Sequence, residues 1–164
     1  MDLSPFDLPL TDPRHPFHLE HMAMALEEAG AAAAEDEVPV GAVIVSFTRG
    51  VLGRAHNQRE GLHDPTAHAE MIAITQAAAA LRSWRLEGCI LYVTLEPCPM
   101  CAQAISFARL RRVYWGAGDP KGGGVEHGPR IFDQPTCHHR PELYPGLGER
   151  EAGELLRAFF KERR

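Results

Sequence analysis

Three side chains that can hold a metal ion and one carboxylate that can move protons stand in two short motifs. The motif His68-x-Glu70 offers an imidazole and a carboxylate, and Cys98-x-x-Cys101 offers two thiols. A catalytic zinc ion takes three protein ligands and keeps its fourth position open for water. His68, Cys98 and Cys101 fit the three ligand positions, which leaves Glu70 free. The motifs therefore predict a site that activates water.

The chemistry of such a site needs both the metal and the free carboxylate. Water is a weak nucleophile at neutral pH, but its pKa falls to about 7 on zinc, where it becomes a hydroxide. Glu70 beside the metal can take the proton and pass it on to the substrate and then to the leaving group. We therefore expect attack by zinc hydroxide with Glu70 as the proton shuttle.

The local sequence predicts that both motifs stand where helices start. Pro65 and Thr66 suit the start of a helix that runs to about residue 81, with His68 and Glu70 in its first turn. A second helix is expected from Cys98 to about residue 110, because prolines favour a helix entrance. Residues three apart share one side of a helix, so both sulfurs should point the same way.

The cysteine pair could have two other functions. A lone Cys-x-x-Cys can be a redox pair or half of a structural zinc site. A structural site needs four ligands, and the chain has no second Cys-x-x-Cys motif. A redox pair leaves the His68-x-Glu70 motif without a role. The remaining cysteines, Cys89 and Cys137, are expected to be a buried apolar residue and a loop thiol rather than a disulfide.

Hydrophobic periodicity predicts the elements that must position these motifs. Strands are expected at residues 40–45, 51–56, 89–95 and 112–116, and further helices at 17–34 and 149–161. A hairpin followed by strand–helix alternation indicates a mixed α/β sheet with helices on both faces. Residues 57–65 and most of 118–148 should be loop, the latter with room for a short helix or strand. Residues 1–16 should be a flexible arm, and residues 17–164 a single domain.

Composition limits where the protein works and what it binds. The 164 residues are 45% hydrophobic and 24% charged, which is typical of globular proteins. No apolar run of 18 residues and no secretory signal is present, so no membrane partner is expected. The cysteine usage indicates a reducing, cytoplasmic setting.

The net charge of −5 is unevenly distributed. Residues 1–37 hold nine of the 22 acids but one of the 17 lysines and arginines, which leaves residues 38–164 with 13 acids and 16 bases. Arg109, Arg111 and Arg112 cluster within this part, and the chain ends in further bases. Such clusters are more often solvated faces than binding sites, but they permit RNA binding.

The pattern His-x-Glu followed by Pro-Cys-x-x-Cys is the signature of zinc nucleobase deaminases. From about residue 19 onward the chain resembles the bacterial tRNA adenosine deaminase branch of the cytidine-deaminase-like superfamily. The shared segments are residues 37–42, Asn57, and residues 63–70, 91–97 and 159–164. This resemblance implies a three-layer α/β/α fold around a five-stranded mixed sheet, a homodimer and one Zn²⁺ per subunit. It also implies conversion of adenosine to inosine at the wobble position, within a tRNA anticodon loop.

The resemblance also implies residues that contact the substrate. Asn57 would contact the flipped base, the backbone of Ala69 would face it, and Phe159 or Phe160 would lie near the RNA. The base pocket would be lined by Pro39, Val40, Gly41 and Ala42. From the residues alone, Asn57 could equally be a turn residue, and the two phenylalanines are most simply core residues.

The chain departs from this branch at two places. Pro99 between the two cysteines is more typical of guanine and general nucleoside deaminases. The stretch 122–140 is also unusual, being richer in proline and only partly reproducing an Asn-His-Arg element at His138, His139 and Arg140. His138 and His139 are tempting ligands, but paired loop histidines are more often surface residues.

Three functions remain to be distinguished. The first is deamination of adenosine in tRNA. The second is deamination of a free base or nucleoside, with guanine or cytosine as the main candidates, and single-stranded DNA or another heterocycle as a remainder. A third, of another class, is a binding module without catalysis, against which Glu70 argues because a structural zinc site needs no free carboxylate.

Overall fold

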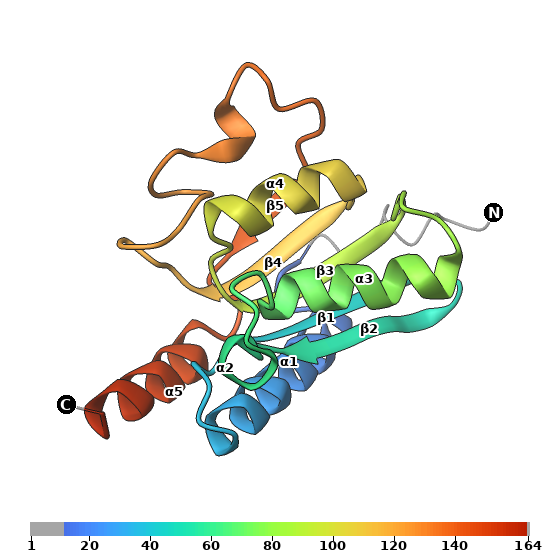
Figure 1. Ribbon diagram of the computed structural model, residues 1–164. Helices are drawn as coiled ribbons and strands as arrows, with labels where there is room; N and C mark the ends of the chain where they lie inside the picture. Colours follow the sequence, from blue (N-terminus) through green and yellow to red (C-terminus); the bar gives the residue numbers. More distant parts are fainter. Residues whose placement is uncertain (1–11, 164) are drawn as a thin grey trace.

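A computed structural model describes residues 12–163 of the chain (Figure 1). Its elements are α1 (Pro16–Ala34), β1 (Gly41–Ser46), β2 (Gly50–His56), α2 (Arg59–Leu62), α3 (Ala69–Leu81), β3 (Cys89–Leu95), α4 (Pro99–Ala108), β4 (Arg112–Ala117), the 3-10 helix η2 (Ile131–Asp133), β5 (Glu142–Pro145) and α5 (Glu149–Lys161). Residues 1–11 of the predicted flexible arm lie outside the described range. None of the helices within residues 12–163 is long and apolar enough to cross a bilayer.

The five strands form one mixed sheet in the order β2-β1-β3-β4-β5. β1 pairs antiparallel with β2 and β3, whereas β3–β4 and β4–β5 are parallel pairs. Figure 1 shows α3 and α4 on one face of this sheet and α1 and α5 on the other. The expected three-layer α/β/α fold with a five-stranded mixed sheet is confirmed, and β5 is the strand for which the stretch 118–148 had room.

Each face of the sheet carries its own apolar core, because side chains alternate along a strand. On β1, Ala42 and Ile44 pack towards α3 and α4, while Val43 and Val45 pack towards α1. Gly41 also faces α1, where a Cβ atom would stand 1.9 Å from the carbonyl oxygen of Ala25. A glycine at this position therefore lets α1 lie directly on the sheet.

The sheet register brings the two motifs to one edge. Gly41 at the start of β1 pairs with His56 at the end of β2, and Ala42 pairs with Val93 near the end of β3. The carboxyl ends of β2 and β3 therefore meet at the same edge, and the chain goes on from there into α3 and α4. This edge is where an α/β sheet ordinarily places its ligand.

Three expectations from the sequence are wrong in detail. The helix expected from Pro65 begins at Ala69, because the carboxylate of Asp64 accepts hydrogen bonds from the backbone N–H and hydroxyl of Thr66 and makes a turn there. The loop expected at 57–65 contains the short helix α2. Arg112, expected on a solvated face, is 1% exposed and forms an ion pair with Glu142 at 3.1 Å.

Candidate active site

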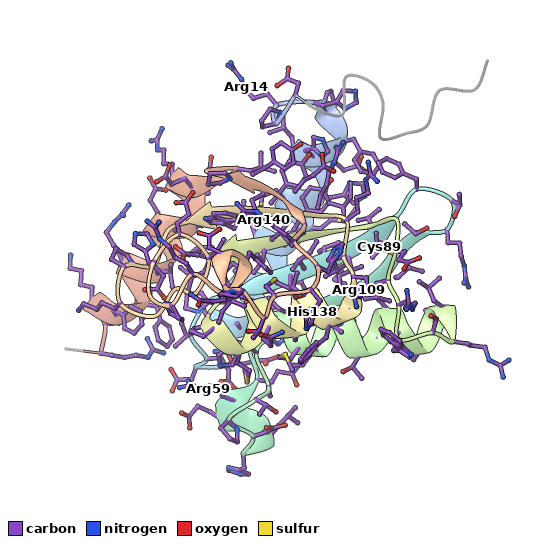
Figure 2. All side chains as sticks on the ribbon, turned by 90° about the horizontal axis from the view of Figure 1, so that it is seen from above. Arg14, Arg59, Cys89, Arg109, His138 and Arg140 are labelled. Atoms are coloured by element: carbon purple, nitrogen blue, oxygen red, sulfur yellow. The ribbon has the colours of Figure 1, made fainter. Side chains whose placement is uncertain are left out.

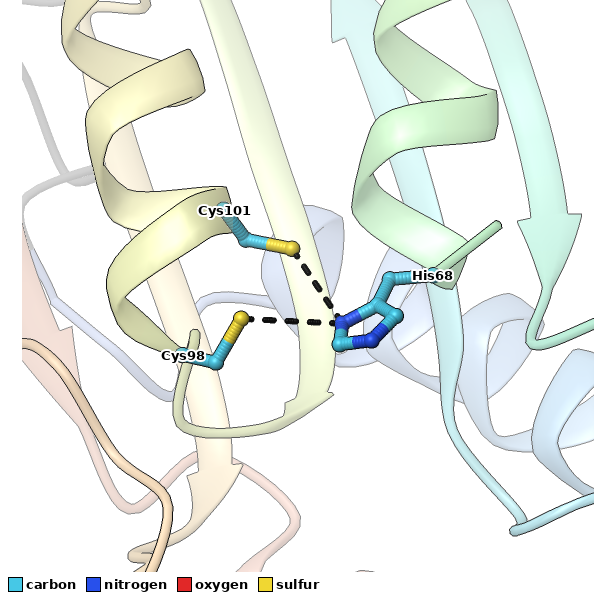
Figure 3. A group of neighbouring side chains, drawn as sticks. All are labelled: His68, Cys98 and Cys101. Carbon is cyan, nitrogen blue, oxygen red and sulfur yellow. Dashed lines mark hydrogen bonds between the residues drawn. The ribbon is translucent and has the colours of Figure 1, made fainter. Parts of the chain in front are cut away.

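The two motifs, far apart in sequence, meet at one point (Figure 3). The Nδ1 atom of His68 lies 3.6 Å from the sulfur of Cys98 and 3.5 Å from the sulfur of Cys101. The three ligand atoms lie within 4.8 Å of one another. Within residues 12–163, this is the one group of three or more histidine, cysteine or acidic side chains with such a spacing.

Helix starts position these ligands. His68 and Cys98 are the extended residues directly before α3 and α4, with φ and ψ of −75° and 152° and of −70° and 171°. Cys101 lies in the first turn of α4, and Pro99 at the helix entrance has the fixed φ that a first turn requires. The unpaired N–H groups of a helix start favour negative charge, which helps to form thiolates there.

The spacing of the three atoms fits a tetrahedral metal ion. Zinc bonds sulfur at about 2.3 Å and imidazole nitrogen at about 2.0–2.1 Å, so tetrahedral angles separate nitrogen from sulfur by about 3.6 Å. The observed separations of 3.6 and 3.5 Å match this value. Two thiolates and one imidazole are also a donor set that zinc prefers. His68, Cys98 and Cys101 could thus hold zinc without rearrangement.

The thiol groups of Cys98 and Cys101 differ in pKa. A hydrogen bond from Cys101, supported by His68, lowers the pKa of Cys98 to about 4, although burial opposes the shift. The same bond to Cys98, together with burial, raises the pKa of Cys101. Cys98 therefore gives up its proton more readily than Cys101, and binding of a metal ion has to displace the proton of Cys101.

Glu70 stands beside the ligands but is not one of them. It lies in the first turn of α3 and is buried, and burial raises the pKa of its carboxyl group to about 7. A carboxylate with such a pKa can both take up and give back a proton near neutral pH.

A cavity of about 220 Å³ opens beside these residues. It is lined by Val38, Val40, Asn57, Arg59, His68, Ala69, Glu70, Leu95, Glu96, Cys98, Asp119 and Gly122. The cavity therefore brings together the carboxylate of Glu70, two of the predicted ligands and three of the predicted substrate contacts. Cys101 is buried behind it.

Other predicted substrate contacts do not line this cavity. Pro39, which directly precedes the lining residue Val40, is itself buried. Gly41 faces α1, and Ala42 belongs to the core beneath α3 and α4. Phe159 is buried in α5 with the guanidinium of Arg163 over its ring. Alternation along β1 explains part of this, because neighbouring strand residues cannot all face one cavity.

Asn57 joins two walls of the cavity. Its side-chain oxygen accepts a hydrogen bond from the N–H of Arg59 at 3.2 Å, and its amide nitrogen donates to the carbonyl of Val38 at 3.3 Å. An asparagine amide has two N–H donors and an oxygen with two lone pairs. One donor and one acceptor therefore remain for a ligand, in addition to the turn role considered from the sequence.

Four polar or glycine residues that line the cavity lie outside the two motifs and the predicted substrate contacts. Arg59 lies on α2, far from Arg14 (Figure 2), while Glu96, Asp119 and Gly122 belong to loops at the ends of β3 and β4. Burial by itself would raise the pKa of the Glu96 carboxyl group. Hydrogen bonds from the loop around Asp119 and from His127 outweigh burial and lower this pKa. A charged residue at the end of a buried strand, directly before Pro97-Cys98, was the available signal.

The histidine pair and the spare cysteines behave as expected from the sequence. His138 is exposed on the loop after η2 (Figure 2), and Nε2 of His139 donates to the carbonyl of Leu110 at 2.7 Å. Neither belongs to the metal-binding group. Cys89 is buried in β3, Cys137 is half-buried in a loop, and both are free thiols.

Comparison with known proteins adds independent information. The family model for the cytidine and deoxycytidylate deaminase zinc-binding region matches residues 16–117. A tRNA-specific adenosine deaminase of Agrobacterium fabrum is 58% identical over 143 residues, covering 87% of this chain and 93% of that protein.

Two solved structures show how far this similarity extends in space. A structure from a study of A-to-I editing by tRNA:A34 deaminases at the wobble position of transfer RNA has a TM-score of 0.81 and 57% identity, covering 84% of this chain and 99% of the other. A guanine deaminase from Bacillus subtilis has a TM-score of 0.61 and 32% identity, covering 77% and 83%.

Proposed function

Because the chain belongs to the family of the cytidine and deoxycytidylate deaminase zinc-binding region, it is a zinc-dependent enzyme of hydrolytic deamination, and we propose that it converts adenosine to inosine in tRNA. The observation that carries the substrate is the 58% identity to a tRNA-specific adenosine deaminase along almost the whole length of both chains. The guanine deaminase shares 32% identity, so deamination of a free base is the second candidate. Pro99 is the feature of this chain that favours it.

We propose His68, Cys98 and Cys101 as the zinc ligands, one ion per subunit. The match between their spacing and tetrahedral zinc supports this assignment. When bound, zinc supplies water that ionises near neutral pH. The start of α4 contributes by stabilising the negative charge of both sulfurs.

Glu70 carries the protons of the reaction. It takes one proton from the attacking water and delivers it to a ring nitrogen of the base. It then takes the second proton of that water from the hydroxyl group newly bonded to the ring carbon, and delivers it to the departing amino group, which leaves as ammonia. Its burial beside the ligands, and a pKa raised to about 7, suit each of these transfers. The net reaction consumes one water and releases one ammonia, with no other reactant.

The cavity holds the base, and the remainder of the nucleotide stays outside. Its volume of about 220 Å³ is below the roughly 300–1,000 Å³ of complete small-ligand pockets, which suits one flipped ring system. The free donor and acceptor of Asn57 address the purine edge, and Val40 and the backbone of Ala69 form the apolar wall. Pro39 and Gly41 flank Val40 in the chain and fix its place in this wall, and Ala42 packs in the core beneath α3 and α4.

The proposed function also includes the RNA that carries the base and the oligomeric state of the enzyme. The base is the wobble adenosine of an anticodon loop. The protein works as a homodimer in the cytoplasm, the compartment in which tRNA is found. Phe107 on α4 and Trp84 after α3, 65% and 63% exposed, give a second copy an apolar surface to cover. Phe160 on α5 is also exposed and is the aromatic available near the RNA.

Ammonia release separates the candidate substrates. The zinc-loaded protein is incubated in parallel with an anticodon stem-loop RNA carrying a wobble adenosine, and with guanine, cytosine and adenosine. We expect release from the RNA at a rate at least about a hundredfold above that from any free compound. Release from guanine or cytosine alone contradicts the tRNA assignment and favours the second candidate.

A further inference from the structure

The carboxylate of Glu96 is buried in the wall of the active site without being a ligand or a proton carrier there. Its side chain is 0% exposed, and it stands between the end of β3 and the helix start at Cys98. A buried carboxylate needs partners for both oxygens, since each unpaired one is costly.

All its partners in the described chain come from one loop, residues 118–127. Oε1 accepts hydrogen bonds from the N–H of Asp119 at 3.1 Å and from Nδ1 of His127 at 2.6 Å. Oε2 accepts from the N–H groups of Val125, Glu126 and His127 at 3.1–3.2 Å. Five donors thus converge on one carboxylate, which is more than a surface acid gathers.

The glycine run 122–124, unusual in the sequence, lets the loop wrap this carboxylate. A Cβ atom on Gly123 would lie 2.2 Å from Oε2 of Glu96, and one on Gly124 would lie 2.5 Å from the nitrogen of Pro99. The N–H of Gly124 also donates to the carbonyl of Pro97 at 2.8 Å. The loop therefore touches both Glu96 and the entrance of α4, and neither contact leaves room for a side chain.

The wrapped loop forms a wall of two cavities. Asp119 and Gly122 line the substrate cavity, whereas Val125, Glu126 and His127 line a second cavity of about 550 Å³. Glu96 is the common anchor of both walls. None of the five donors belongs to His68, Cys98 or Cys101, so the hydrogen bonds of Glu96 do not involve the proposed zinc ligands.

We propose that Glu96 is a positioning residue, which fixes the loop 118–127 and thereby places Asp119 and Gly122 in the wall of the substrate cavity. This inference rests on the proposed function in so far as the cavity receives the base. Glu96 is neither a metal ligand nor a proton carrier in this role, so it acts on substrate binding rather than on the chemical step.

The test is Glu96→Gln in the full-length, zinc-loaded protein. An amide has one accepting oxygen, and its NH₂ group repels N–H donors, so the two or three donors that face one of the two carboxylate oxygens lose their acceptor. We expect amide hydrogen exchange of residues 119–127 to become at least about tenfold faster. KM for the anticodon stem-loop RNA should rise about tenfold or more, while kcat changes less than about threefold and zinc content stays at one per chain.

Glu126→Gln is the matched control, because it makes the same acid-to-amide change on the same loop at an exposed side chain. It should leave exchange and KM unchanged. His127→Ala removes one donor from Oε1 at a half-exposed position and should shift both readouts in the same direction by less. It takes the place of Glu96→Gln if that variant does not fold.

Two results overturn the proposal. One is unchanged exchange of residues 119–127 in the folded Glu96→Gln protein, or in His127→Ala if the first does not fold. The other is loss of zinc and kcat with KM unchanged, which places Glu96 in the metal site. If wild-type protein releases ammonia from a free base only, the tRNA assignment fails. The exchange result still decides the role of Glu96, with KM measured for that base.

Discussion

His68 and Cys98 occupy equivalent places in two different helices, since each is the extended residue directly before the helix begins. The sheet register places these two helix starts at one edge, and the imidazole nitrogen and the sulfur lie 3.6 Å apart. The metal site is therefore a property of the sheet edge as much as of the two motifs.

Cys98→Ser should abolish zinc binding, because a serine hydroxyl does not ionise at neutral pH and is a poor zinc ligand. We expect zinc content to fall below about a tenth per chain and ammonia release to fall at least about a thousandfold. Elemental analysis of the purified protein measures the first value. Cys137→Ser, at a half-buried thiol outside the metal-binding group, should keep its zinc; equal loss in both variants contradicts the assignment.

Glu70→Gln should keep zinc and lose turnover. The amide preserves size but cannot carry a proton, so kcat should fall by about 10²–10⁴ with zinc content unchanged. Glu87→Gln, which changes an exposed acid paired with Arg85, is the control with wild-type rate. Full turnover by Glu70→Gln leaves the proton transfers without a carrier and refutes its role.

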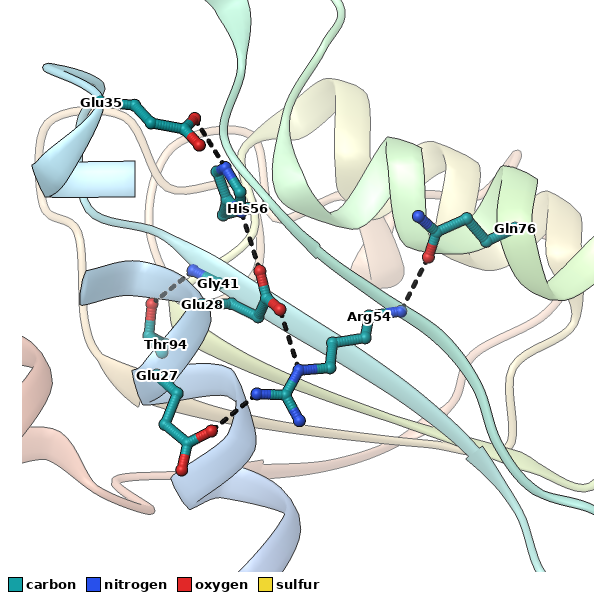
Figure 4. A network of polar contacts seen from close by, with 8 residues as sticks. All are labelled: Glu27, Glu28, Glu35, Gly41, Arg54, His56, Gln76 and Thr94. Carbon is teal, nitrogen blue, oxygen red and sulfur yellow. Dashed lines mark hydrogen bonds and ion pairs between the residues drawn. The ribbon is translucent and has the colours of Figure 1, made fainter. Parts of the chain in front are cut away.

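His56 should make stability depend on pH (Figure 4). Its ring nitrogens each lie 2.8 Å from a carboxylate, that of Glu28 and that of Glu35. Burial opposes the shift, but these two bonds outweigh it and raise the pKa of His56. Because the folded pKa lies above the unfolded one, the contribution is complete below the unfolded value and disappears as pH rises through the folded value.

Comparison with His56→Gln measures this contribution. The variant should unfold more easily than wild type by about 0.5–1 kcal/mol near about pH 6, and the difference should shrink towards about pH 9, where neutral imidazole donates to one carboxylate at most. Denaturant unfolding at both pH values gives the two differences. A difference that grows with pH has the opposite sign and rules out a charged His56 in the folded protein.

Gly41→Ala should destabilise the fold strongly. The added Cβ atom would lie 1.9 Å from the carbonyl oxygen of Ala25, and that backbone cannot move without lifting α1 from the sheet. We expect a loss of about 3 kcal/mol or more in the free energy of unfolding. Gly30→Ala, in the middle of α1 with open space around it, should instead stabilise by about 0.5–1 kcal/mol. Similar effects of the two substitutions contradict this packing.

Local patterns account for the parts of the fold that the sequence predicts well. The strand at residues 89–95 and the helix at 149–161 have the expected bounds, because an apolar run and a helical stripe mark them within the segment itself. The start of α3 was wrong by a few residues, since Asp64 and Thr66 form a turn that competes with the helix. Arg112 was misplaced because its partner Glu142 is 30 residues away.

The candidate site, like the fold, has parts that local sequence patterns predict and parts that depend on distant residues. The three proposed ligands and Glu70 follow from spacing within two short motifs, although the spacing does not say that Nδ1 of His68 is the nitrogen that faces the sulfurs. The cavity wall does not follow, because Glu96 collects donors from a loop that begins 22 residues later. Such contacts depend on how the sheet brings the ends of β3 and β4 together.

X-ray absorption at the zinc edge tests the central claim most directly, since it counts and identifies the atoms bound to the metal. For the purified zinc-loaded protein we predict two sulfur neighbours at about 2.3 Å and two nitrogen or oxygen neighbours at about 2.0–2.1 Å, one of them from imidazole. Four sulfur neighbours, or none, would contradict a catalytic centre built from His68, Cys98 and Cys101.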